Sequence, residues 1–102
     1  MIRGEVWWVE LPEQKRRPYV VFSRDAALGV VNRVIAVPLT RTIRSIPTEV
    51  ALGPDDGLDR ECVASADNIE NIPRWAFIER LAVLPGLKMT ELCTALRHAV
   101  DC

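Results

Sequence analysis

The fold of this chain is set out most clearly in the stretch KRRPYVVFSRD, residues 15–25. A basic loop leads through Pro18 into a run of aromatic and β-branched residues, which favour strands. Proline is tolerated at the first residue of a strand, and it restricts the backbone of the residue before it. The stretch therefore predicts a strand from Pro18 to Arg24, with Arg17 held near the rim of a sheet.

Five further segments have strand character. Aromatic and β-branched residues are frequent in them, and proline or glycine ends several of them. The predicted strands are residues 5–11, 30–39, 48–52, 62–66 and 77–84, with residues 26–29 as a connection and residues 72–75 as a short helical turn.

The last segment changes from strand to helix periodicity. Apolar side chains recur at steps of three and four between residues 87 and 100, after the helix breakers Pro85 and Gly86. Short strands followed by one helix predict a mainly β (α+β) domain over residues 1–102, a small bent sheet or barrel with a helix against it. The predicted apolar face of the helix contains Met89, Leu92, Cys93, Leu96, Ala99 and Val100.

Charge is distributed unevenly along the chain. The net charge is −1, yet residues 1–48 carry eight Lys and Arg against four acids, and residues 49–102 carry five against ten. The first half can therefore supply a local basic patch for phosphate groups. No apolar run approaches the roughly 20 residues that span a bilayer, and the acidic start does not resemble a secretory signal, so we expect a cytoplasmic protein without membrane contact.

The cysteines argue against a disulfide framework or a structural metal. Cys62, Cys93 and Cys102 are odd in number and widely spaced, and the single histidine, His98, falls on the predicted helix. We expect free thiols, no metal and no cofactor.

A second basic stretch, PLTRTIRSIPTEV, spans residues 38–50 and places three hydroxyls and two arginines within residues 40–45. Guanidinium and hydroxyl groups contact phosphate and sugar in nucleic-acid complexes. A polar loop between strands, with threonines chosen for strand propensity, would have the same composition. Arg16 and Arg17 can likewise be read as solvated loop residues, so composition leaves both readings open.

Five short motifs occur in a fixed order: RGEVW at 3–7, RPYVV at 17–21, VPLT at 37–40, PTEV at 47–50 and CVASADNI at 62–69. Together with the terminal helix, this order resembles the MazF/PemK family of toxin endoribonucleases over essentially the whole chain. The resemblance implies an SH3-like barrel of the CcdB/PemK type with a C-terminal helix. It also implies a homodimer that cleaves single-stranded RNA (mRNA, tRNA or rRNA loops) without a metal, as the toxin of a type II toxin–antitoxin system silenced by a MazE-like antitoxin.

The resemblance further implies that Arg17 and Thr48 form the catalytic pair, with the ribose 2′-hydroxyl attacking the adjacent phosphate. Arg17 would stabilise the five-coordinate phosphorus, and Thr48 would add a hydrogen-bond donor. Arginine is a poor base because its pKa lies above about 12, so a water, the substrate or an acid such as Glu13 or Asp25 is expected to take the proton. The residues assigned to substrate binding are Arg16, Ser23, Thr40, Arg41, Thr42, Arg44 and Asn68.

Two other functions remain open at this point. One is a non-enzymatic CcdB-like gyrase poison on the same fold, and the other is a catalytically inactive RNA-binding barrel. The tryptophans do not decide between them, because each can stack on a base, pack in the core or meet a dimer partner. Strand alternation places Trp7 and Trp8 on opposite faces, so at most one belongs to the core, and Trp75 is unassigned.

Overall fold

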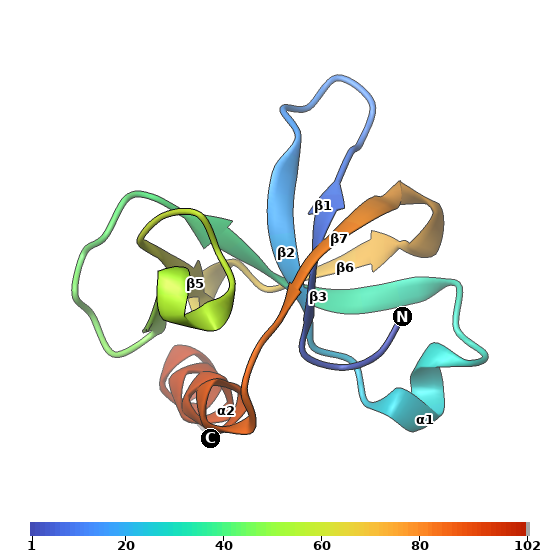
Figure 1. Ribbon diagram of the computed structural model, residues 1–102. Coiled ribbons are helices and arrows are strands. Elements are labelled where there is room, and N and C mark those ends of the chain that lie inside the picture. The colour runs from blue at the N-terminus through green and yellow to red at the C-terminus, as the bar shows by residue number, and fades with distance from the viewer. Residues whose placement is uncertain (102) are drawn as a thin grey trace.

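The computed structural model describes residues 1–101 and has seven strands and two α-helices within them (Figure 1). In Figure 1 the loop between the first two strands projects at the top, away from the C-terminal helix at the bottom. The strands are β1 (Glu5–Val9), β2 (Arg17–Val21), β3 (Arg33–Thr40), β4 (Glu49–Leu52), β5 (Cys62–Ser65), β6 (Glu70–Pro73) and β7 (Phe77–Val83). The helices are α1 (Asp25–Leu28) and α2 (Gly86–Val100), with 3₁₀ turns η1 (Pro54–Asp56), η2 (Ala66–Asn68) and η3 (Arg74–Ala76).

The sheet is antiparallel and bends around β3, its longest strand. The strands lie in the order β4-β5-β3-β2-β1-β7, and β6 pairs with β3 outside this path. β3 pairs with β6 through residues 33–36, with β2 through residues 36–38 and with β5 through residues 39–40. The mainly β class with a terminal helix is confirmed, but the sheet is not a closed barrel, because β4 and β7 remain its edges.

Two hydrophobic cores lie on opposite faces of the sheet. One lies beneath α2 and includes Val20, Val37 and Leu92, while the other lies beneath β6 and α1 and includes Val21 and Ile72. Alternating side chains of β2 therefore enter different cores, as the pleat of a strand requires. Because both faces of β2 are buried, the strand is a rigid support for the side chain of its first residue, Arg17.

Several local predictions need correction. Residues 70–73 form a strand that was not predicted, and the helical turn starts at Arg74 rather than at residue 72. Only Ile72 of that strand is buried, so its sequence carries no readable alternation. The third strand starts at residue 33 instead of 30, and residues 25–28 are helical. On α2, Val100 is 55% exposed and Ala95 takes a buried position instead.

Within residues 1–101, no helix is both long and apolar enough to cross a membrane.

Candidate functional site

Some polar side chains of the two basic stretches lie on the face of the bent sheet that points away from the core beneath α2, here named the outer face. Leu39 of β3 pairs with Ala64 of β5, and both belong to the core beneath α2, as does Val20 of β2. Since successive side chains of a strand point to opposite faces, the neighbours of these residues point away from that core. The positions on the outer face include Arg17, Tyr19, Thr40, Ser65 and Glu49.

Arg17 is the first residue of β2 and lies opposite Val9 of β1. It is exposed at the foot of the β1–β2 loop, where it lines a small recess with Gln14, Lys15 and Tyr19. Among residues 1–101, its guanidinium has neither a hydrogen bond nor an ion pair. The whole planar fork of donors is therefore available to an anion such as a phosphate.

Thr48 precedes β4 and is joined to the turn η2. Its hydroxyl donates to the Asp67 carboxylate with an Oγ1–Oδ2 distance of 2.6 Å, and its carbonyl accepts the Ala66 N–H at 2.9 Å. The next residue of η2, Asn68, donates through Nδ2 to the Ser65 hydroxyl at 2.8 Å. The short O–H···O⁻ bond from Thr48 to Asp67 is charge-assisted and fixes the rotation of the Thr48 hydroxyl. The hydroxyl proton of Thr48 is thus directed at Asp67, while its oxygen can still accept a proton.

Glu49 anchors the loop that carries the second arginine cluster. Its Oε1 accepts the backbone N–H groups of Arg44 and Ser45, at 2.9 and 3.1 Å, and its side chain is only 3% exposed. Ser45 has a left-handed φ of 55°, which marks a tight turn at this point. The loop also contains a Thr42 N–H bond to the Thr40 hydroxyl, at 3.2 Å. The basic loop is therefore held by buried and local bonds rather than left free.

Tyr19 and Glu70 form a further hydrogen-bonded pair, next to Arg17. Tyr19 is 6% exposed, and its hydroxyl donates to Oε2 of Glu70, which is itself exposed on β6. Burial first, and then the bond to the Glu70 carboxylate, raises the pKa of the Tyr19 phenol, while the positive charge of Arg17 lowers it in part. Tyr19 therefore stays protonated and remains a donor to Glu70.

The candidate residues fall into distinct groups. Thr48, Asn68, Thr40, Thr42 and Arg44 belong to the hydrogen-bonded part of the outer face. Arg17 does not line a recess with Thr48; it shares a recess with Tyr19, whose hydroxyl is bonded to Glu70. Arg41 lines a separate recess with Trp8, Thr40 and Arg60.

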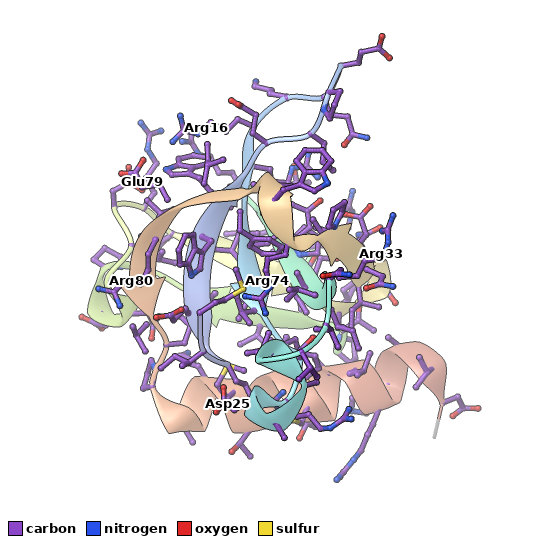
Figure 2. All side chains as sticks on the ribbon, turned by 90° about the vertical axis from the view of Figure 1, so that its right-hand side faces the viewer. Arg16, Asp25, Arg33, Arg74, Glu79 and Arg80 are labelled. Atoms are coloured by element: carbon purple, nitrogen blue, oxygen red, sulfur yellow. The ribbon has the colours of Figure 1, made fainter. Side chains whose placement is uncertain are left out.

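Two residues predicted to bind substrate, Arg16 and Ser23, make contacts within the protein instead. Figure 2 shows Arg16 and Glu79 pointing toward one another; their ion pair is 3.1 Å long, and Arg16 also lies 4.7 Å from the centre of the Trp8 ring. Ser23 is buried, and its hydroxyl accepts the Ile35 N–H at 2.8 Å. Both side chains are therefore bound to other residues of the protein.

The aromatic and acidic side chains left open by the sequence are also placed. Trp7 packs against the second core, Trp8 lies beneath Arg16, and Trp75 is 66% exposed. Asp25, a candidate base, accepts the Arg3 N–H at 2.7 Å.

Sequence reasoning missed three residues of the outer face: Asp67, Tyr19 and Glu70. Tyr19 lies inside the RPYVV motif and Asp67 inside the CVASADNI motif, next to residues that were chosen. A rule that pairs each candidate hydroxyl with a nearby acid would have retained Asp67. Nothing local in the sequence marks the contact between Tyr19 and Glu70, because 51 positions separate them.

An unpaired guanidinium and a separate hydroxyl–carboxylate pair on one small β domain are groups that can contact the phosphate and sugar of a nucleic acid. Residues 2–100 match the family model described as the PemK-like, MazF-like toxin of type II toxin–antitoxin systems. The chain therefore belongs to the PemK/MazF toxin family.

Individual relatives agree with this family. The chain is 44% identical to the probable endoribonuclease MazF5 of Mycobacterium tuberculosis H37Rv over 98% of this chain and 93% of that protein. A solved mycobacterial endoribonuclease in complex with its cognate antitoxin is 34% identical, with a TM-score of 0.87 over 99% of this chain and 95% of that one. MazF in a MazE–MazF complex from Deinococcus radiodurans is 28% identical, with a TM-score of 0.82 over 99% and 96%. These relatives do not favour a gyrase poison or an inactive barrel.

Proposed function

We propose that this chain is the toxin of a type II toxin–antitoxin system and cleaves single-stranded RNA in the cytoplasm without a metal. The observation that carries the proposal is the pairing of Thr48 with Asp67 on the same sheet as an unpaired Arg17. These groups supply a proton acceptor and a cation for a phosphodiester. The endoribonuclease names of the relatives support the same chemistry.

In the proposed reaction, the ribose 2′-oxygen attacks the adjacent phosphorus, and the bond from phosphorus to the 5′-oxygen breaks. Arg17 donates two parallel hydrogen bonds to the phosphate oxygens, where negative charge develops. The products are a 2′,3′-cyclic phosphate and a 5′-hydroxyl end, with the leaving oxygen protonated by water.

Thr48 has a different role here from that of a phosphate donor. Because its proton is directed at Asp67, its oxygen is left to accept the proton of the 2′-hydroxyl. The 2′-proton then moves to Thr48 while the Thr48 proton moves to Asp67, which balances the step. General base assistance of this kind contributes about a hundredfold to ten-thousandfold in rate.

The test uses defined mRNA and tRNA pools with purified protein in EDTA, with both new ends mapped. We expect cyclic phosphate and 5′-hydroxyl ends, and a loss of at least about a hundredfold in Arg17→Ala. Arg17→Lys keeps the charge but lacks the planar fork, so it is expected to recover only part of the rate. Arg97→Ala, at an exposed position of α2, is the matched control. Absence of cleavage in both pools, or full activity in Arg17→Ala, would reject the proposal.

We also propose two protein partners. One is a second copy of this chain, supported by the edge strand β7, which exposes Ile78, Leu81 and Val83. The other is a MazE-like antitoxin, supported by the solved relatives in complex with theirs. Light scattering of the purified chain, alone and with the co-expressed antitoxin, tests both, and a monomeric mass at micromolar concentration would contradict the dimer.

A further inference from the structure

The outer face contains an exposed acid, Glu70, that the proposed chemistry does not use. Glu70 lies on β6, opposite Ala36 of β3, and is exposed on the same face as Tyr19 and Arg17. No ion pair joins Glu70 to Arg17 within residues 1–101, although both lie close enough to Tyr19 to influence its ionisation. The face thus holds a cation and an anion on either side of their common neighbour Tyr19, with no ion pair between them in the described residues.

A carboxylate at this place has to be compatible with RNA. It repels the phosphate backbone, so it favours binding only if it accepts hydrogen bonds from donors of a base. Bases of single-stranded RNA expose their Watson–Crick edges, where such donors are found.

Tyr19 holds Glu70 in a fixed position for this purpose. The phenol occupies one acceptor position on Oε2, and a carboxylate has about four such positions on its two oxygens. Each oxygen therefore keeps a free lone pair. Because Tyr19 is buried in the second core, its hydroxyl is a rigid donor that limits the rotamers of an otherwise mobile surface glutamate.

We propose that Glu70 reads a guanine close to the scissile phosphate, and that Tyr19 is the residue that positions it. Guanine is the base whose Watson–Crick edge presents two adjacent donors, N1–H and the N2 amino group, to the two oxygens of one carboxylate. Cytosine and adenine place a ring acceptor beside their amino group, and uracil has a single donor between two carbonyls. The inference rests on the proposed function, since it assumes that Arg17 marks the phosphate.

The first experiment measures cleavage specificity on a randomised RNA pool by sequencing the new ends. We expect the wild-type protein to enrich guanine at one position within about two nucleotides of the cut. Glu70→Gln should lower that enrichment about 10-fold to 100-fold, the range of one bidentate base contact, while cleavage itself continues. Tyr19→Phe should weaken it by a smaller factor, and Glu91→Gln on α2 should leave it unchanged.

The second experiment measures binding without cleavage, so that it remains informative if the chain does not cut RNA. The probe is a 2′-deoxy decamer containing guanine, compared by fluorescence anisotropy with the same decamer containing inosine, which lacks the N2 amino group. Wild-type protein should bind the inosine decamer several-fold more weakly, and Glu70→Gln should bind both equally.

The outcomes separate the two proposals. If wild-type protein cleaves and Glu70→Gln keeps the same base preference, the reading of guanine is overturned and the nuclease stands. Complete loss of cleavage in folded Glu70→Gln would also overturn it, because Glu70 would then act in the chemistry. Equal binding of guanine and inosine decamers by the wild-type protein would overturn it independently of any cleavage.

Discussion

Replacing Thr48 by valine tests the proton path most directly. Valine is branched at Cβ like threonine but has a methyl group in place of the hydroxyl, so the substitution removes the hydroxyl and keeps the branched side chain. The 2.6 Å bond to Asp67 is then lost together with the acceptor for the 2′-proton. We expect the cleavage rate under single-turnover conditions to fall about 100-fold to 10,000-fold, which corresponds to about 2.7–5.4 kcal/mol in activation free energy.

The effect on folding should be much smaller than the effect on rate. Asp67 is exposed, so water can replace the lost hydrogen bond, and we expect a decrease of about 1 kcal/mol in the free energy of unfolding. For a domain of this size that lowers the melting temperature by roughly 4–8 °C. Measuring both quantities therefore separates a lost proton path from a damaged fold.

Two variants complete the experiment. Thr48→Ser retains the hydroxyl and should keep most of the rate. Thr94 is an exposed residue of α2 whose hydroxyl donates to the Thr90 carbonyl, so Thr94→Val should cleave like the wild-type protein. If folded Thr48→Val cleaved within about threefold of the wild-type rate, a factor far below that of general base assistance, the proton path through Thr48 would be refuted.

Three further predictions concern stability and thiol chemistry. Leu92 is 1% exposed, so Leu92→Ala should lower the free energy of unfolding in urea by about 2–5 kcal/mol, and a loss below about 1 kcal/mol would contradict its place in the core. The raised pKa of Tyr19 means that the folded state holds this proton more tightly than the unfolded state, whose phenol titrates near pH 10. Stability should therefore fall as pH rises above about 10, and an equally steep fall in Tyr19→Phe would assign it to other groups. Burial, with the charges of Asp56 and Asp59, raises the pKa of the Cys62 thiol, so alkylation at pH 8, mapped by mass spectrometry, should be slow in the native protein and fast in urea.

The sequence predicted the elements whose pattern is long or strongly marked. Pro18 marks the start of β2, although the strand ends at Val21 and not at the predicted Arg24. Steps of three and four define α2 almost to the residue. The missed strand β6 is four residues long with two exposed polar side chains, so it has no period to read. Ala36 of β3 pairs with both Val21 of β2 and Glu70 of β6, so β6 lies on the edge of β3 opposite β2. On that edge β5 pairs only with residues 39–40, and β6 forms because residues 33–36 are left open, which is a property of the assembled sheet.

The candidate site was predicted in the same uneven way. Arg17 and Thr48 are candidates because of the motifs that contain them, whereas the contacts around them depend on register. Pairing of β4 with β5 brings Thr48 to Asp67 across 19 positions, and the packing of β6 on β3 brings Glu70 to Tyr19. The pairing register of the strands depends on which side chains the two cores bury, and this register cannot be read from a single sequence.

The surplus of basic residues in the first half of the chain overstates the free positive charge of the site. Arg16 is held by Glu79 and the Trp8 ring, while Arg17 has neither a hydrogen bond nor an ion pair within residues 1–101. Arg44 is only partly neutralised. Glu49 accepts its backbone N–H, and its guanidinium lies 3.9 Å from the Glu49 carboxylate, with 59% of the Arg44 side chain exposed. Neighbouring arginines thus differ because the strand pleat and the acids beside them differ. Charge available to RNA is therefore set by the strand register, and counting basic residues does not measure it.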